Sequence, residues 1–179
     1  MKFITGNIGK FNEMKEFFPG LQQLDIDLPE IQELDPHLVI AAKIKEAQGI
    51  VPAGTEFIIE DTSLCVSALN DLPGTFVKWF LDSLGTNGIW NLVKDNPNKK
   101  AYAKTIIGYN DSNNNIHFFE GIIDGHIIAP TNTGFGWNPL FQADGSSKNF
   151  SEMNLIEKKQ FSMRAQAAQK LQQFLDIKN

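Results

Sequence analysis

The hydrophobic and polar positions of this chain follow helical spacing in three long segments. Apolar residues recur every three or four positions in 11–18, 36–48 and 162–177. Pro19-Gly20 ends the first segment, and Asp35 is placed to cap the second, with Pro36 at its first position and Gly49 after its last. We expect the last helix to bury an apolar stripe made of Ala165, Ala168, Leu171, Phe174 and Leu175.

Strand-like patterns lie between these helices. They predict strands at 24–28, 57–59, 101–109, 116–123 and 126–129. Two shorter helices are expected at 75–84 and 89–94, after the chain breaks at Leu72-Pro73-Gly74. Helices early and late with a β-meander between them are typical of a mixed α/β fold. The chain contains neither an internal repeat nor a linker, so we expect one domain over 1–179.

Composition narrows the class of protein without changing this picture. The 179 residues are 42% hydrophobic and 21% charged, as in ordinary globular domains. A net charge of −5 argues against a general polynucleotide binder, which needs a basic face. The single cysteine, Cys65, excludes an intramolecular disulfide, and no apolar run is long enough to span a membrane. We expect a cytoplasmic protein that binds neither nucleic acid polymers nor membranes.

The polar loop Thr5-Gly6-Asn7-Ile8-Gly9-Lys10 leads from an apolar strand into the first helix. Backbone N–H groups at a helix start, glycines and one lysine together suit a phosphate group. The spacing differs from a Walker loop, because two residues separate the glycines and Phe11 follows the lysine. An ordinary strand-to-helix turn is the alternative interpretation.

Acidic residues follow two of the expected strands. Glu30 comes just past one strand, and Glu60-Asp61 ends the buried strand 57–59. Ligands of open α/β sheets bind beyond the carboxyl ends of strands, and neighbouring carboxylates there can share Mg²⁺. The alternative is that these acids are helix caps or rim salt bridges.

Cations and aromatics supply the remaining candidates. Lys78 follows Val77 and precedes Trp79-Phe80, so its stem should cover apolar surface while its head reaches a rim. Phe135-Gly136-Trp137-Asn138-Pro139 offers aromatics to stack on a flat base and an amide to bind its edge. Core packing is the alternative for these aromatics. The three histidines have no spacing that suits a metal site or a triad.

Six short motifs occur in an order that matches a known family. They are Thr5-Gly6-Asn7 with Lys10, Leu28-Pro29-Glu30, Glu60-Asp61-Thr62 with Leu64, Leu72-Pro73-Gly74 followed by Lys78-Trp79-Phe80, Phe135-Gly136-Trp137, and Glu157-Lys158 before Ser162 and Arg164. Over nearly its whole length the chain resembles the inosine triphosphate pyrophosphatase family, the Ham1-like enzymes. Lys78-Trp79-Phe80 is more similar to the eukaryotic branch than to the usual bacterial one.

This resemblance implies a mixed α/β fold with a long central mixed sheet flanked by helices, two lobes around a nucleotide cleft, and a homodimer. It implies Mg²⁺-dependent hydrolysis of (deoxy)nucleoside triphosphates, such as ITP, dITP and XTP, to the monophosphate and pyrophosphate. Glu30 and Asp61 would bind the metal, and Asp61 would also accept the proton of the attacking water.

The resemblance also implies a substrate-binding set. Thr5, Gly6, Asn7 and Lys10 would hold the triphosphate, and Phe135 would stack on the base. The other members, which would contact phosphate or line the nucleotide site, are Lys43, Thr62, Lys78, Gly136, Trp137, Asn138, Lys158, Met163 and Arg164.

Two positions depart from the family pattern. Asn138 stands where the family has aspartate, and Met163 stands where it has histidine. Methionine cannot donate a hydrogen bond to a 6-keto group, whereas asparagine offers both a donor and an acceptor. We therefore expect a relaxed or shifted base preference.

Two other functions remain as alternatives. One is a nucleotide-binding sensor, or a degenerate family member without useful catalysis. The other is a pyrophosphatase for modified pyrimidine nucleotides, which shares the chemistry and differs at the base.

Overall fold

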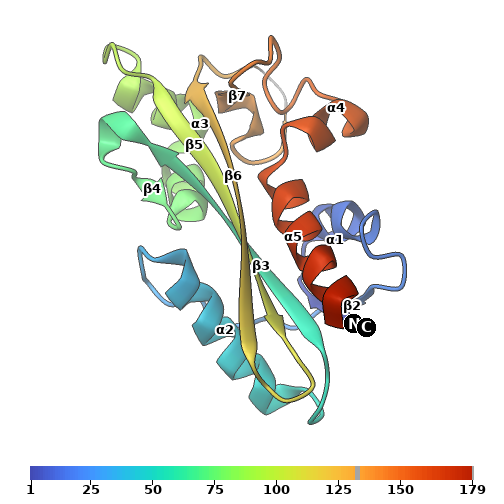
Figure 1. Ribbon diagram of the computed structural model, residues 1–179. Coiled ribbons are helices and arrows are strands. Elements are labelled where there is room, and N and C mark those ends of the chain that lie inside the picture. Colours follow the sequence, from blue (N-terminus) through green and yellow to red (C-terminus); the bar gives the residue numbers. More distant parts are fainter. Residues whose placement is uncertain (132–133, 179) are drawn as a thin grey trace. The chain divides into compact units, whose positions relative to one another are not determined.

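The structure is a computed structural model that describes residues 1–131 and 134–178. Helices and strands alternate along the chain (Figure 1). The helices are α1 (Ile8–Lys15), α2 (Pro36–Ile50), α3 (Val77–Val93), α4 (Leu155–Gln160) and α5 (Met163–Lys178), with short 3₁₀ turns at Ser67–Leu69 and Asn138–Leu140. The strands are β1 (Lys2–Ile4), β2 (Gln22–Leu24), β3 (Phe57–Val66), β4 (Pro73–Gly74), β5 (Lys100–Asn110), β6 (Ile116–Ile127) and β7 (Phe141–Ala143).

The described strands form one mixed sheet of seven, in the order β2-β1-β3-β5-β6-β7, with β4 paired to β3. Strand β1 runs parallel to β2 and to β3, with Lys2 opposite Gln22 in one pair and opposite Phe57 in the other. β4 pairs antiparallel with β3, and β7 antiparallel with β6. A mixed sheet flanked by helices confirms the fold class expected from the sequence.

The chain divides into two compact units. Unit 1 comprises Met1–Asp61, Thr105–Gly121 and Arg164–Asn179, and unit 2 comprises Thr62–Lys104 and Ile122–Met163. Strands β3, β5 and β6 each contribute residues to both units.

Unit 1 has helices on both faces of its strands. Side chains alternate across a strand, so Phe3 of β1 packs with α1 and α5 while its neighbour Ile4 packs with α2. On the α5 side the core includes Ala168 and Leu171, as the apolar stripe predicted. Figure 1 shows α2 and α5 against opposite faces of these strands.

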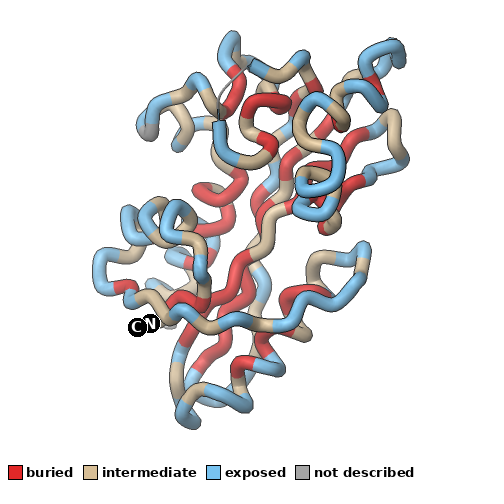
Figure 2. Tube along the Cα trace, turned by 180° about the vertical axis from the view of Figure 1, so that it is seen from behind, coloured by how far each residue is buried: buried red, intermediate tan, exposed pale blue. Residues whose placement is uncertain are grey.

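Unit 2 buries a separate apolar core. Leu64 and Val66 of β3 pack with Val77 and Ile89 of α3 in this core. It also includes Trp137, Leu140, Phe141, Phe150 and Met163. Buried residues follow the strands, and the loops are largely exposed (Figure 2).

The start of α2 agrees with the signals in the sequence. The Asp35 carboxylate accepts the His37 backbone N–H at 2.9 Å, and Pro36 opens α2. Gly49 does not end this helix, which continues to Ile50. Helix α1 begins at Ile8 and not at Phe11, because the Asn7 side chain caps it.

Strand lengths were less predictable. β3 continues through Glu60-Asp61-Thr62 to Val66, so the two acids lie inside the strand and not at its end, contrary to expectation. The strand accommodates these acids because basic side chains pair with them: Lys10 and Arg164 with Glu60, and Lys43 with Asp61. The two strands expected at 116–123 and 126–129 are one continuous strand, β6, which ends at Ile127.

The other differences are local. The two helices expected at 75–84 and 89–94 form the single element α3, broken at Gly85, whose φ of 65° is non-helical. Residues 24–28 are strand only at Leu24, where β2 ends. The short elements β7 and α4 were not predicted.

Candidate active site

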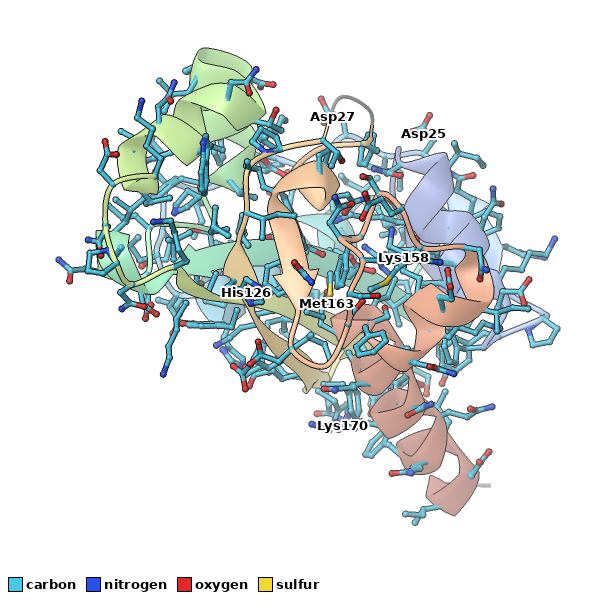
Figure 3. All side chains as sticks on the ribbon, turned by 90° about the horizontal axis from the view of Figure 1, so that it is seen from above. Asp25, Asp27, His126, Lys158, Met163 and Lys170 are labelled. Atoms are coloured by element: carbon cyan, nitrogen blue, oxygen red, sulfur yellow. The ribbon has the colours of Figure 1, made fainter. Side chains whose placement is uncertain are left out.

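The loop between β1 and α1 is fixed by its own polar side chains. Thr5 Oγ1 accepts the Asn7 backbone N–H at 3.1 Å, and Asn7 Oδ1 accepts the Lys10 backbone N–H at 3.0 Å. A Cβ on Gly6 would lie 3.1 Å from Oδ1 of Asp25, which belongs to the segment after β2 (Figure 3). Glycine at position 6 therefore lets the loop pass close to that segment.

Lys43 joins the two acids expected to bind a metal. It lies on α2 with 7% of its surface exposed, and its Nζ is 2.8 Å from Glu30 Oε1 and 3.6 Å from Asp61 Oδ1. Glu30 lies in the irregular segment after β2, and Asp61 lies within β3. Three elements distant in sequence thus bring one ammonium group and two carboxylates together.

A second group of charges adjoins Asp61 in sequence. Lys10 Nζ is 3.2 Å from Glu60 Oε1, and the Arg164 guanidinium contacts Glu60 and Glu13. The seven side chains of Lys10, Glu13, Glu30, Lys43, Glu60, Asp61 and Arg164 all belong to unit 1, and we call them the charge cluster.

Burial dominates the electrostatics of Asp61. It raises the pKa of this carboxyl above 3.8, an effect that Lys10 and Lys43 oppose and that Glu30 and Glu60 reinforce. A carboxylate with a raised pKa is a better proton acceptor near neutral pH than an ordinary aspartate. Asp61 is therefore suited to deprotonate water.

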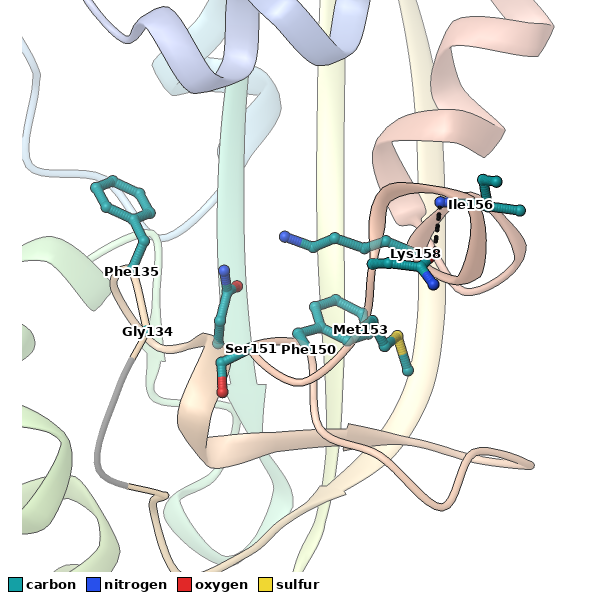
Figure 4. Close-up of a pocket in the computed structure, with 9 residues that line it drawn as sticks. Gly134, Phe135, Phe150, Ser151, Met153, Ile156 and Lys158 are labelled. Carbon is teal, nitrogen blue, oxygen red and sulfur yellow. Dashed lines mark hydrogen bonds between the residues drawn. The ribbon is translucent and has the colours of Figure 1, made fainter.

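Unit 2 contains a pocket of about 670 Å³ (Figure 4). It is lined by Gly134, Phe135, Asn138, Phe150, Ser151, Met153, Asn154, Ile156 and Lys158. Phe135 is 75% exposed, and Lys158 Nζ lies 5.8 Å from the centroid of the Phe150 ring. An aromatic ring, an amide and a cation therefore line one cavity.

The residues of the 135–138 motif have different surroundings. Phe135 and Asn138 line the pocket. Trp137 is buried in the core of unit 2, with its ring centroid 5.7 Å from that of Phe141 and 5.8 Å from that of Phe150. Gly136 has a φ of 60°, a conformation that favours glycine. Part of the 131–137 loop, residues 132–133, lies outside the described residues.

Three other predicted site residues, Met163, Lys78 and Thr62, belong neither to the charge cluster nor to the residues that line the pocket. Met163 is buried in the apolar core of unit 2. Lys78 is exposed on α3, with its Nζ 5.9 Å from the Trp79 ring centroid, and Thr62 lies on β3. Figure 3 marks Met163 and Lys158 on their ribbons.

The sequence did not predict that Glu13 and Glu60 both pair with Arg164. Glu13 is three residues after Lys10 on α1, a spacing that places both on one helix face and gave a usable signal. Nothing local links Glu60 to Arg164, since 104 residues separate them.

Two kinds of feature are absent from the described residues. Those residues contain no group of three or more His, Cys, Asp and Glu side chains arranged to hold a metal ion. Among them, no helix is sufficiently long and apolar to cross a membrane.

The fold is that of the Ham1 proteins. The solved structure of the Staphylococcus aureus Ham1 protein superposes with a TM-score of 0.85 over 100% of both chains, at 22% identity. A HAM1 protein from Coxiella burnetii gives 0.77 over 98% of both chains, also at 22% identity.

Sequence comparison gives the family. The Ham1 family model matches residues 1–174. The inosine triphosphate pyrophosphatase of Schizosaccharomyces pombe is 39% identical, and the alignment covers 97% of this chain and 94% of that protein. The Kluyveromyces lactis protein of the same name is 34% identical with the same coverage. This chain belongs to the Ham1 family, which confirms the resemblance inferred from its motifs.

Proposed function

We propose that this protein is a nucleoside triphosphate pyrophosphatase that converts non-standard purine nucleoside triphosphates, such as ITP, dITP and XTP, to the monophosphate and pyrophosphate. Family membership and the names of its relatives support the reaction. The observation that carries the proposal is the position of Asp61, a carboxylate whose side chain is only 17% exposed and which lies in the same charge cluster as Lys10, Lys43 and Glu30.

The triphosphate would bind to unit 1. Thr5, Gly6, Asn7 and Lys10 supply a loop at a helix start, where backbone N–H groups and a lysine favour phosphate oxygens. Lys43 supplies a second cation within the charge cluster. Lysines at these positions would neutralise the charge that develops on the phosphoryl oxygens.

Asp61 would act as general base. It would accept a proton from a water molecule whose oxygen forms a bond to the α-phosphorus. The bond from this phosphorus to the bridging oxygen then breaks, and pyrophosphate leaves. Burial favours this role by raising the pKa of Asp61.

Glu30 and Asp61 are the residues that would hold Mg²⁺. In the structure, Lys43 Nζ lies within 3.6 Å of an oxygen of each carboxylate, so the space between Glu30 and Asp61 already accommodates a positive charge. Two carboxylates suit Mg²⁺, which usually takes one or two from the protein and the rest of its ligands from water and phosphates. When bound, the metal would neutralise phosphate charge.

The pocket of unit 2 would receive the base. Phe135 is exposed for stacking, and Asn138 and Lys158 line the same cavity. Because an asparagine side chain both donates and accepts, Asn138 fits a 6-amino purine as well as a 6-keto purine. We therefore propose a weaker preference for ITP over ATP than an aspartate at this position would give.

The remaining members of the proposed substrate-binding set have supporting roles. Thr62, Lys78 and Gly136 would line the nucleotide site, while Trp137 and Met163 would act from the core by shaping the pocket walls. We also propose that residues 1–179 form one functional domain, because three strands belong to both units. We further propose that the protein is cytoplasmic and forms a homodimer. Light scattering, which measures the molar mass in solution, tests the dimer.

The test is pyrophosphate release from a panel of ITP, XTP, ATP, GTP and pyrimidine triphosphates at millimolar Mg²⁺. We expect turnover by the wild type and a loss of about 10²–10⁴-fold in kcat for Asp61→Asn. Asp176→Asn, an exposed aspartate on α5, is the matched control. Equal turnover by wild type and Asp61→Asn would exclude the proposal, and binding without turnover would favour a sensor.

A further inference from the structure

Two segments of unit 2 form the walls of the pocket. Gly134, Phe135 and Asn138 line it from the loop that leads into the 3₁₀ turn. Ser151 and Lys158 line it from the segment 149–158, which runs into α4 (Figure 4). A flat, rigid ligand binds best between walls whose spacing is fixed before it arrives, because ordering them on binding costs free energy.

The second wall contains the pattern Asn-x-x-Glu twice, at Asn149–Glu152 and at Asn154–Glu157. Each asparagine Oδ1 accepts the backbone N–H of its glutamate, at 3.2 Å in the first pair and at 2.9 Å in the second. Each glutamate accepts the backbone N–H of its asparagine at 2.9 Å. This reciprocal arrangement is that of a capping box, although only the second pair opens a helix. The two pairs fix the backbone of this wall locally.

Asn149 alone of the two asparagines also reaches the chain before the first wall. It is 1% exposed, and its Nδ2 donates to Thr131 Oγ1 at 3.1 Å. Ser151 Oγ donates to Asn149 Oδ1 at 2.6 Å, and the Thr131 and Ser151 hydroxyl oxygens lie 3.3 Å apart. Since the other two donors are already used, the Thr131 hydroxyl donates to Ser151 and closes a ring of hydrogen bonds. We call these three side chains the hydroxyl–amide ring.

The walls also touch at Gly134. A Cβ at this position would lie 2.6 Å from Ser151 Cβ and 2.8 Å from Pro139 Cγ, so the backbone of Gly134 packs directly against Ser151. Phe135 follows Gly134, and with 75% of its surface exposed its ring has little packing of its own. The position of Phe135 therefore depends on the contact between its wall and Ser151.

We propose that Asn149 is a positioning residue for base binding, which holds the two walls of the pocket at a fixed spacing through Thr131 and Ser151. This inference rests on the proposed function only in assigning the base to this pocket. The ring belongs to unit 2, whereas the loop and the lysine proposed to hold the triphosphate, 5–10 and Lys43, belong to unit 1. Loss of the ring should therefore weaken binding of a ligand with a base and leave binding of a bare polyphosphate unchanged.

Two substitutions break the ring from opposite sides. Asn149→Ser keeps an oxygen that can cap the turn, but its side chain is too short to reach Thr131. Thr131→Val keeps the shape and removes the hydroxyl at an exposed position. Because both remove the same contact, the double variant should be no worse than the weaker single variant. Asn98→Ser is the matched control, since Asn98 Oδ1 accepts the Lys100 backbone N–H at 3.0 Å outside the pocket.

Calorimetry compares two ligands, inosine monophosphate, which carries a base, and inorganic tripolyphosphate, which does not. We expect Asn149→Ser and Thr131→Val to bind inosine monophosphate about three- to tenfold more weakly than wild type, the equivalent of one hydrogen bond. Tripolyphosphate should bind to both variants as it binds to wild type. Asn98→Ser should leave both affinities unchanged.

Kinetics provide the second measurement. Asn149→Ser and Thr131→Val should raise KM for ITP by the factor found for inosine monophosphate and leave kcat unchanged, as expected when a contact serves substrate and transition state equally. A ring that only stabilised the fold would lower the melting temperature and leave KM of the folded enzyme at the wild-type value.

Thermal unfolding checks that each variant folds. If Asn149→Ser does not fold, Thr131→Val decides alone, because it leaves both Asn-x-x-Glu pairs in place. Unchanged binding of inosine monophosphate to folded Thr131→Val would overturn the inference. An equal loss of tripolyphosphate binding, or additive losses in the double variant, would also overturn it.

The two proposals fail in different ways. A wild type that binds inosine monophosphate but hydrolyses no ITP would refute the proposed function alone, since the calorimetric comparison would still decide the role of Asn149. A wild type that hydrolyses ITP, with the same KM as Asn149→Ser and Thr131→Val, would refute the inference alone.

Discussion

The two units bury polar groups in different ways. Among the described residues, every buried charged side chain lies in unit 1, and these are Lys43, Glu60, Asp111 and Arg164. The buried polar residues of unit 2 are uncharged, namely Ser63, Thr75 and Asn149. Buried charges are costly unless they are paired. Lys43, Glu60 and Arg164 belong to the charge cluster, whereas Asp111 accepts the backbone N–H groups of Asn113 and Asn115 in a turn. This difference is consistent with the proposal that unit 1 binds the phosphates and that the pocket of unit 2 receives the base.

Removal of divalent metal should have the largest effect. Excess EDTA should abolish pyrophosphate release, because the triphosphate would lose the charge neutralisation expected at Glu30 and Asp61. Restoration by added Mg²⁺ serves as the control. Full activity in EDTA would show that the lysines of unit 1 suffice.

Lys43→Met should lower kcat/KM by about 10²-fold, since it removes a cation held between two carboxylates. Lys45→Met is the matched control, an exposed lysine two positions along the same helix. Steady-state kinetics on ITP measure both variants. If the two variants behave alike, Lys43 has no special role in the charge cluster.

Phe135→Ala should raise KM by about tenfold with little change in kcat, because a stacked aromatic contributes about 1–3 kcal/mol to binding a base. Phe118→Ala, at a partly exposed phenylalanine on β6, is the comparison. An equal KM in wild type and Phe135→Ala would show that Phe135 does not stack on the base.

Met163→His should affect stability more than activity. Its side chain packs in the apolar core of unit 2, where an imidazole would leave a polar group unsatisfied at a cost of about 1–3 kcal/mol. Met163→Leu, which nearly conserves volume, should cost less than about 1.5 kcal/mol. Thermal unfolding compares the two. An unchanged melting temperature with an altered ITP/ATP ratio would place position 163 at the base.

The sequence predicted the elements more reliably than their ends. Helix α2 was predictable because Asp35 and Pro36 are local signals for its start. Strand β3 was predicted too short because two acids interrupt its apolar run, and only basic partners from α1, α2 and α5 explain why the strand continues.

The candidate site was predictable in its parts and not in its connections. Ordered motifs identified Lys10, Glu30, Asp61 and Lys158 as candidates, and the family resemblance added Lys43. They could not reveal that Lys43 joins Glu30 to Asp61, or that Arg164 pairs with Glu60. These contacts depend on tertiary packing between segments far apart in sequence, for which periodicity and local spacing carry no signal.

The most direct test of the division between the units is the ratio of kcat/KM for ITP to that for ATP, measured by pyrophosphate release. Wild type, Lys43→Met and Asn138→Asp are compared, with Asn91→Asp on the exposed face of α3 as control. The account predicts that Lys43→Met lowers both rates equally and leaves the ratio unchanged, whereas Asn138→Asp raises the ratio. A ratio that changes in Lys43→Met and stays constant in Asn138→Asp would contradict it.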